Sequence, residues 1–356
     1  MHPGNSGINI YGEIKYMKKF LHITSLLIIL LLNTGFSKVT KTGTTAAKFL
    51  SIGIGPRANA MGGAFTSVVN DASALYWNPA GAANLTDYEA MFTYTSLFKD
   101  LDINLNYTAI VIPAGSLGNF GVSVTALDYG DMNVTTELYP EGTGEKFSAS
   151  SYAFALSYAR NITESFTAGI TIKYISEKIF NSSANGFAVD IGTIFNTPFY
   201  GIKFSSIITN YGSKLQMAGE DLLVRHDADP TRKGNNETVD AYYKTDKFEL
   251  PLKLQIGLSK EFELFENQKF TLAVDAAHPN DNAEYVNVGG ELALFDNIFC
   301  LRGGYKALFM EDSQEGLALG AGLNYTLGIL TIGIDYAFQE YKFLGDTHSF
   351  GVLLKF

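Results

Sequence analysis

Apolar and polar residues alternate along most of the chain from residue 88 onward. In residues 252–259 every second position is apolar, and these positions are Leu252, Leu254, Ile256 and Leu258. The same period recurs in 270–275 and in 332–336. Because successive side chains of a strand point to opposite faces, this pattern predicts β-strands with one apolar face.

The other face of these strands is small or charged. Its charged members are Lys173, Asp190, Lys253, Asp275, Glu291 and Asp335. Enclosing so many charges in the dry core of a sandwich would be costly. We therefore expect this face to meet solvent, or the lumen of a wet or plugged barrel. The alternation alone does not separate a membrane barrel from a half-exposed soluble sheet.

Segments of this kind recur often enough to form a closed barrel. They lie near 88–96, 102–112, 118–128, 147–159, 165–178, 186–195, 201–210, 249–260, 269–277, 284–294, 298–307, 316–326, 329–339 and 347–356. Most have the roughly 9–11 residues that a tilted strand needs to cross a bilayer. The predicted fold is all-β: a transmembrane antiparallel β-barrel of about 14 strands, the even count that bacterial outer-membrane barrels have, formed by residues 88–356.

The connections between these strands alternate in length. The longer, odd-numbered connections are 129–146, 211–248, 308–315 and 340–346, and short even-numbered ones are 113–117, 160–164 and 327–328. In a barrel with both chain ends in the periplasm, the odd-numbered connections face outward and are longer. A soluble sandwich gives no reason for this alternation.

The first 37 residues have the layout of a secretory signal peptide. Met17-Lys18-Lys19 is a short positive segment, 20–32 is an apolar core, and a cleavage site with small residues ends near Ser37. We expect translation to start at Met17 and the cleaved chain to reach the outer membrane. The apolar core is too short for a spanning helix; an uncleaved anchor is the alternative.

Composition supports a barrel without deciding the matter. Charged residues make up 17% and hydrophobic residues 46% of the 356 residues, whereas soluble domains carry about 25% charged residues. No run after residue 37 is long and apolar enough for a membrane helix. A large soluble β-sandwich or β-helix fits the composition too. The net charge is −10 and no basic stripe is present, so nucleic acid is not an expected partner.

Residues 38–87 do not alternate and are rich in small residues. Alanine-rich stretches favour short helices, and glycine and proline interrupt them. Asp71 is placed to cap a turn over 72–77, and Asn78-Pro79 is a turn signal. We expect this segment to fold back into the barrel as a plug. An ordinary periplasmic extension is the alternative.

Two stretches of this segment carry a family resemblance. Residues 57–65 (RANAMGGAF) and 71–81 (DASALYWNPAG) resemble the N-terminal signature of the FadL-like outer-membrane superfamily, and most closely that of the PorV/PorQ family. The matching residues are Arg57, Met61, Gly62, Gly63, Asp71, Ala72, Tyr76, Trp77, Asn78, Pro79 and Gly81. The resemblance implies a fourteen-stranded barrel with these residues in a plug, and not in a catalytic centre.

The sequence contains no enzyme signature. The histidines have no metal-ligand spacing, and the lone Cys300 has no cysteine partner. Asp227 and Asp229 form one short acidic pair, which is far from a calcium cage. We expect no catalytic residue, no cofactor and no metal. The chain ends on an alternating strand with Phe356, which resembles the C-terminal signal read by the barrel-assembly machinery.

Three functions stay open. PorV-like proteins serve the type IX secretion system of Bacteroidetes-type bacteria, where they bind the C-terminal signal domains of secreted cargo and pass them to surface-attachment proteins. By that resemblance the loop 211–248 would face cargo, with Arg225, Asp227, Asp229, Arg232 and Lys233; its mixed charge suits reversible protein contact. A FadL-like passive transporter of hydrophobic molecules is the alternative, although the inward faces, mostly small or charged, disfavour a large apolar pocket. A purely structural barrel in the outer-membrane lipid is the third.

Overall fold

A computed structural model describes residues 42–98, 101–231, 238–310, 313–343 and 345–356. The predicted signal peptide and its cleavage site at Ser37 lie outside these residues. Across the described ranges, no helix has the length and apolar character needed to cross a membrane.

Fourteen strands form the wall. Each pairs antiparallel with the next along the chain, and β17 pairs with β1, which closes the barrel. They are β1 (Glu89–Leu97), β2 (Ile103–Pro113), β3 (Asn119–Asn133), β4 (Lys146–Asn161), β5 (Phe166–Ile179), β6 (Ser182–Asn196), β7 (Ile202–Gly212), β11 (Lys253–Phe265), β12 (Gln268–Pro279), β13 (Tyr285–Leu294), β14 (Phe299–Leu308), β15 (Glu315–Leu327), β16 (Leu330–Tyr341) and β17 (Thr347–Lys355). The predicted strands are all confirmed, with ends that differ by a few residues.

The two faces of the wall are arranged as the alternation predicts. In β11, Leu254, Ile256 and Leu258 are exposed on the outside, whereas Gln255 between them is 2% exposed. The same holds in β12, where Asp275 is fully buried inside. Such an apolar outer face around a closed wall is the form in which strands cross a bilayer. The molecule is a transmembrane antiparallel β-barrel.

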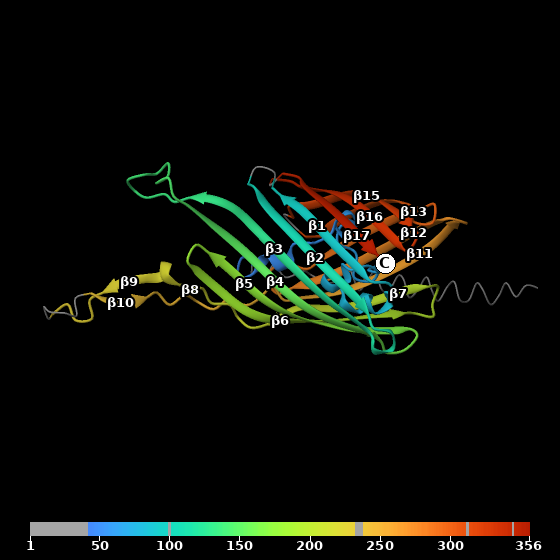
Figure 1. The fold of residues 1–356 in the computed structure, drawn as a ribbon, viewed down its shortest axis with the longest axis horizontal. Coiled ribbons are helices and arrows are strands. Elements are labelled where there is room, and N and C mark those ends of the chain that lie inside the picture. The colour runs from blue at the N-terminus through green and yellow to red at the C-terminus, as the bar shows by residue number, and fades with distance from the viewer. Residues whose placement is uncertain (1–41, 99–100, 232–237, 311–312, 344) are drawn as a thin grey trace, which may run out of the picture. The chain divides into compact units, whose positions relative to one another are not determined.

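The two ends of the barrel differ. Connections 134–145 and 213–252 lie at one end, called here the long-loop end, while 114–118 (with η3, Gly115–Leu117), 162–165 and 328–329 lie at the other, the short-turn end, together with the C-terminus (Figure 1). One odd-numbered connection is unexpectedly short. Strand β6 begins at Ser182 rather than near 186, so only residues 180–181 separate it from β5.

The longest connection, 213–252, contains regular structure where the sequence predicts a loop. β8 (Ala218–Gly219) extends the sheet beside β6, and η4 (Glu220–Leu222) follows. β9 (Leu223–His226) and β10 (Val239–Tyr242) then pair as a separate two-stranded hairpin beyond the barrel (Figure 1).

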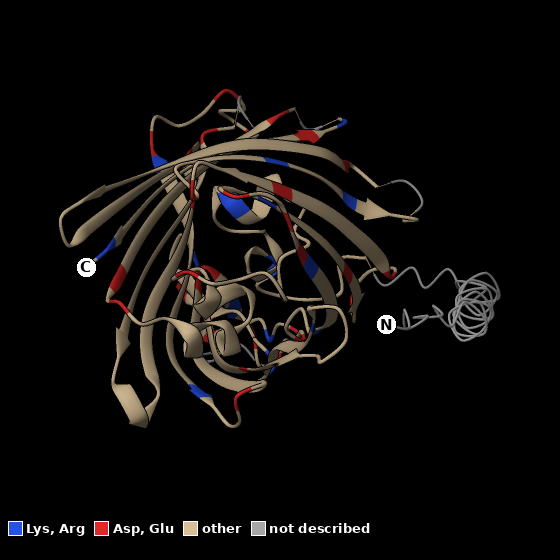
Figure 2. Cartoon of the chain, turned by 90° about the vertical axis from the view of Figure 1, so that its right-hand side faces the viewer, with Lys and Arg blue, Asp and Glu red and all other residues tan. Residues whose placement is uncertain are grey.

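Residues 42–87 lie inside the barrel as a series of short helical turns (Figure 2). These are η1 (Lys48–Ser51), α2 (Pro56–Ala60), α3 (Ala74–Trp77) and η2 (Pro79–Asn84). Proline begins α2 and η2, because its missing N–H group is not needed at the first helical position. Asp71 caps a turn as predicted: it accepts a hydrogen bond from the N–H of Ser73 at 2.9 Å, and α3 follows. This segment is the plug.

Candidate functional site

The plug runs the length of the lumen. Near the long-loop end, the ammonium group of Lys48 lies 2.6 Å from the carboxylate of Asp281. Near the short-turn end, the side-chain amide of Asn119 donates to the carbonyls of Ala82 and Leu85 at 2.6 and 2.7 Å. The chain therefore crosses the lumen from one end to the other before it enters β1.

Tyr76 and Trp77 hold the first part of the plug against the second. The Tyr76 hydroxyl donates to the carbonyls of Leu50 and Ile52 at 3.0 and 2.7 Å. The indole N–H of Trp77 donates to the carbonyl of Ile54 at 2.9 Å. Buried backbone carbonyls need such partners, since no water reaches them. These two signature residues thus satisfy the extended backbone between η1 and α2.

Asn78 joins the plug to the wall. Its amide nitrogen donates to the carbonyl of Thr66 at 3.0 Å and to that of Thr193 in β6 at 3.2 Å. Its amide oxygen accepts from the N–H of Ala80 at 3.2 Å and so begins η2. Asn78 is fully buried, so every one of these bonds replaces a bond to water.

The remaining signature residues pack at very short range. Met61 and Ala72 are fully buried. Gly62 has φ +63°, and a β-carbon there would lie 2.8 Å from the backbone nitrogen of Tyr305. Gly81 is equally enclosed: a β-carbon there would lie 2.6 Å from Val69. Glycines of the wall leave room for the plug because they have no side chain. They are Gly121, Gly169, Gly192, Gly289, Gly304, Gly320 and Gly351. Gly63 and Pro79 also lie in the plug.

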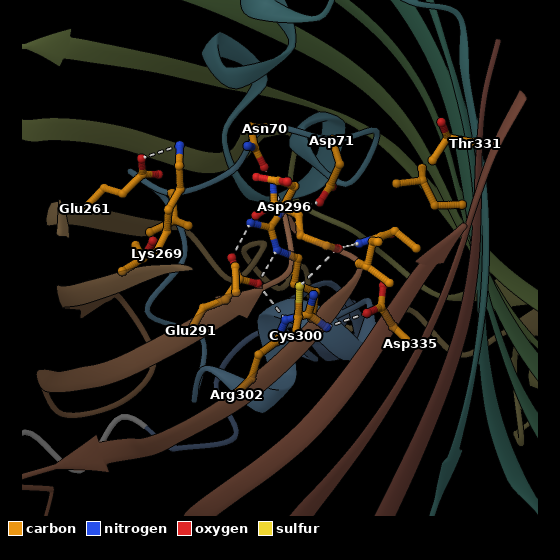
Figure 3. A pocket seen from close by; sticks show the side chains of 18 of the residues that line it. Asn70, Asp71, Glu261, Lys269, Glu291, Asp296, Cys300, Arg302, Thr331 and Asp335 are labelled. Carbon is orange, nitrogen blue, oxygen red and sulfur yellow. Dashed lines mark hydrogen bonds and ion pairs between the residues drawn. The ribbon is translucent and has the colours of Figure 1, made fainter. Parts of the chain in front are cut away.

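An ion network links the plug to the wall near the short-turn end (Figure 3). Arg57 donates to both oxygens of Glu291, each at 2.8 Å, and to Asp71 of the plug at 2.8 Å. Glu291 also accepts from Arg302 at 2.6 Å, and Arg302 pairs with Asp335. We call these five residues the inner ion network. Bidentate pairing of this kind is both strong and specific in geometry.

Asp71, the plug carboxylate of this network, has a shifted pKa. Burial raises the pKa of Asp71, but the charge of Arg57 and a hydrogen bond from Ser73 outweigh it, so the pKa lies below its usual range. Arg57 therefore favours the ionised form of Asp71.

Asp275 makes a second charged contact with the plug. One oxygen of its carboxylate accepts from the N–H groups of Phe65 and Thr66 at 2.9 and 3.0 Å, and from the Thr66 hydroxyl at 2.9 Å. Gln255 donates to the same oxygen at 2.9 Å. The alternation placed Asp275 on the inward face, but its plug partners were not predictable, because they lie about two hundred positions away in sequence.

A cavity of 570 Å³, the inner cavity, lies beside the inner ion network at the short-turn end (Figure 3). Its lining is charged with both signs and includes Arg57, Lys269, Glu261, Asp296, Arg302 and Asp335. A neighbouring cavity of 430 Å³ lies at the same end, and Lys203 lines both. The volume of the inner cavity falls in the range of small-molecule sites, roughly 300–1,000 Å³.

The long-loop half of the lumen contains large apolar side chains rather than a charged cavity. Phe49 and Leu50 of the plug belong to one buried cluster with apolar wall and loop residues. The latter are Leu97, Leu105, Leu127, Ile175, Leu215 and Leu250, and we call them the outer apolar cluster. Most inward positions of the wall in this half are small or polar as expected, such as Thr95, Ser151 and Ala153, and the large apolar residues are an addition to them. The two cavities next to Leu50 and Tyr76 are each only about 10 Å³, so the plug itself fills the space.

The described members of the predicted cargo-facing set lie in β9 and in the connection from β9 to β10, away from the plug. Arg225 in β9 lies opposite Asp240 of β10 in the strand register and is exposed, and Asp229 is half-buried. Asp227 accepts from the N–H of Asp229 at 3.0 Å. Arg232 and Lys233 lie outside the described residues.

The chain end closes the barrel. Tyr88 and Phe356 exchange two backbone hydrogen bonds of 3.0 Å, and their rings stack with centroids 5.9 Å apart.

Among the residues that the structure describes, no three His, Cys, Asp or Glu side chains gather closely enough to hold a metal ion. His278 and His348 lie on strands and each has a neighbour within hydrogen-bond distance, Glu284 and Tyr336. Cys300 is buried in β14.

Comparisons with known proteins point to one fold. The toluene transporter TodX of Pseudomonas putida superposes with a TM-score of 0.52 at 12% identity, over 85% of this chain and 97% of that one. The toluene transporter TbuX of Ralstonia pickettii gives a TM-score of 0.50 at 12% identity, over 85% and 97% of the two chains. This chain has the fold of these toluene transporters.

Sequence comparisons add less. The model of a family described as an uncharacterised protein family (UPF0164) matches residues 33–209. A comparison with curated proteins found no match. The narrower resemblance to PorV/PorQ proteins stays a prediction.

Proposed function

We propose that this protein is an outer-membrane channel that passes small hydrophobic molecules. The observation that carries the proposal is a fourteen-stranded barrel whose lumen is filled by the N-terminal segment, in a fold shared with two toluene transporters. The apolar belt outside the wall and the predicted signal peptide support a place in the outer membrane.

The outer apolar cluster is where such a molecule would first bind. Phe49 and Leu50 fill it in the structure, and both are buried. A small aromatic molecule has the size and the chemistry of the Phe49 side chain, so it can take the place of that ring when the segment before α2 withdraws. Burying an aromatic ring in a lined apolar site gives the main attraction, since the contribution grows with the apolar area removed from water.

Uptake by cells tests this proposal, because the intact outer membrane is the barrier that the channel would overcome. The protein is expressed in a Gram-negative host that lacks its own hydrophobic-compound channel, and entry of labelled toluene and labelled palmitate is measured. Ile175→Asn places an amide in the outer apolar cluster and is expected to reduce entry. Leu138→Asn is the matched control, because Leu138 lies in an exposed loop and is 85% exposed.

Equal entry with and without the protein contradicts the channel. Migration of both variants as heat-modifiable barrels on gels is required, because a misfolded variant would also lower entry.

The β9–β10 hairpin favours a second function, that of a type IX secretion accessory. Hydrogen bonds hold the start of the hairpin to the barrel. Asp221, just before β9, accepts from the N–H of Asn181 at 2.8 Å and from the hydroxyl of Ser182 at 3.0 Å. A charged hairpin held beyond the long-loop end suits contact with a secreted protein domain, as the PorV/PorQ resemblance implies.

Deleting residues 214–245 and bridging the gap with glycine and serine tests this second function. Loss of co-purified cargo C-terminal domains from a folded barrel supports it. Cargo capture that persists without the hairpin contradicts this second function, whatever the outcome of the uptake assay.

A further inference from the structure

The outer face of the wall changes from apolar to polar toward the long-loop end of β4 and β5. Every second residue of a strand lies on the same face, so the outward series of each strand can be followed along its length. The apolar members are Leu156, Phe154 and Tyr152 on β4 and Ile172 and Tyr174 on β5, and all five are exposed. The polar members that follow are Ser150, Ser148 and Lys146 on β4 and Ser176 and Lys178 on β5. Tyr152 and Tyr174 therefore stand at the boundary, where aromatic residues of barrels meet the membrane interface.

A pocket of about 300 Å³ lies just beyond this boundary, and we call it the wall pocket. Its lining includes Asp131, Lys146, Ser148, Ser150, Lys178 and Phe180. In the strand register, Lys178 lies opposite Ser150, and Asp131 lies opposite Ser148. Residues directly opposite each other in an antiparallel pair share a face. The polar side chains of the wall pocket thus lie together on the outward face of β3, β4 and β5.

The wall pocket holds two ammonium groups that carboxylates match only weakly. Among the described residues, none forms an ion pair with Lys178, which is exposed. Lys146 lies 3.8 Å from Asp131, with side chains that are 61% and 66% exposed, and so open a pair contributes little. Asp128, opposite Ser150, accepts from the N–H of Gly130 at 3.1 Å. Two lysines with serine hydroxyls beside them can neutralise a phosphate group and donate hydrogen bonds to it.

We propose that the wall pocket binds the phosphate of a lipid headgroup, in the membrane leaflet at the long-loop end. Its position supports a lipid as the occupant. Acyl chains that cover Phe154 and Ile172 end in headgroups near the level of Tyr152 and Tyr174, and the pocket begins there. Its charge supports phosphate, because a neutral headgroup would supply no counter-charge to the lysines. The inference goes beyond the proposed channel, since it holds whatever the barrel passes.

Lipid retention by the intact barrel tests the pocket. The detergent-solubilised protein is mixed with dioleoyl phosphatidylglycerol, or with dioleoylglycerol, which has the same acyl chains and no phosphate. Bound lipid is counted by native mass spectrometry. We expect the double variant Lys146→Gln/Lys178→Gln to retain several-fold less phosphatidylglycerol than the wild type. The matched control is Lys214→Gln/Lys247→Gln, which removes two equal charges from exposed positions of the 213–252 connection at the same end.

Three outcomes overturn the proposal. The first is equal retention of phosphatidylglycerol by the two double variants, both migrating as heat-modifiable barrels. The second is equal retention of the two lipids by the wild type, since the apolar belt alone would then account for binding. The third is displacement of the lipid by inorganic phosphate at the same concentration, which would make the pocket a site for a free anion.

The depth of the wall pocket is tested in vesicles of phosphatidylethanolamine and phosphatidylglycerol. In a Cys300→Ser background, a nitroxide label is attached at Ser148→Cys, and its collisions with oxygen and with a water-soluble nickel complex are measured. Oxygen concentrates among acyl chains, whereas the nickel complex stays in water. We expect values between those of labels at Leu156→Cys, in the apolar belt, and Leu138→Cys, in the exposed connection 134–145. Collisions with nickel as frequent as at Leu138→Cys would place the pocket clear of lipid and overturn the proposal.

Discussion

Gly192 of β6 lies so close to Asn78 of the plug that a β-carbon on the glycine would be 2.1 Å from the amide oxygen of Asn78. No real pair of atoms of this kind approaches so near. The wall is thus shaped at this position for one particular plug side chain, and that side chain is held in turn by Thr66 and Thr193. Plug and wall are a fitted pair here, and a change on either side should be felt by the other.

Gly192→Ala is expected to loosen the plug. Overpacking of a filled interior costs typically about 1–3 kcal/mol. The chain has one tryptophan, Trp77, which lies in the plug, so its fluorescence reports plug unfolding selectively. We expect a lower midpoint in a denaturant titration of the detergent-solubilised protein. Gly303→Ala is the control, because its β-carbon would lie 3.6 Å from Leu319, an ordinary contact. Identical midpoints for the two variants would contradict the fitted pair.

Asp275→Ala should weaken the plug by another mechanism. It leaves the N–H groups of Phe65 and Thr66 without their acceptor, and each unsatisfied buried group costs about 1–3 kcal/mol. Asp275→Asn keeps a carbonyl oxygen at this place and is expected to cost less. The same Trp77 titration gives the order wild type, Asn, Ala. Equal losses in the two variants, which both lack the charge, would show that the charge rather than the acceptor matters at this site.

The wall was predictable because one rule governs it. Alternation with a period of two follows from strand geometry and lipid contact, so Leu254, Ile256 and Leu258 identified their strand without any knowledge of its partners. The plug was predictable as a segment, because its small residues and Asn78-Pro79 break every regular pattern. The pairing of Arg57 with Glu291 was not, since 234 positions separate them and nothing local marks either residue as the partner.

The outer apolar cluster escaped prediction for a physical reason. In β3, Phe120 and Val122 face outward in the apolar belt, but nearer the long-loop end Leu127 is buried inside while Asp128 is exposed. The apolar face thus changes sides along one strand. At that end the outer face of the strand meets water rather than lipid. A single alternating pattern over the whole strand therefore does not predict that the leucines face inward there.

Acid should release the plug through Asp71. Its pKa is lowered in the folded protein, so its ionised form stabilises the docked plug above the usual aspartate pKa of about 3.9, and this contribution is lost as pH falls toward the folded value. We expect the denaturation midpoint reported by Trp77 to fall as the pH drops below about 5. Asp71→Asn should lower the midpoint at neutral pH and flatten the further fall.

Asp131→Asn is the control for this pH series, because Asp131 is exposed and pairs only loosely with Lys146. A fall as steep in Asp71→Asn as in the wild type would assign the acid sensitivity to other carboxylates.

The last residue offers a way to separate assembly from stability. Phe356 stacks on Tyr88, so removing either ring removes the same contact. If Phe356 is the signal that the assembly machinery reads, Phe356→Ala should lower the amount of barrel in the outer membrane, whereas Tyr88→Ala should leave it near the wild-type amount. Quantitative blotting of outer-membrane fractions, with thermal unfolding of the purified variants beside it, makes the comparison. Equal losses in both variants would mean that the stacked pair matters for closure of the barrel, and that Phe356 carries no separate signal.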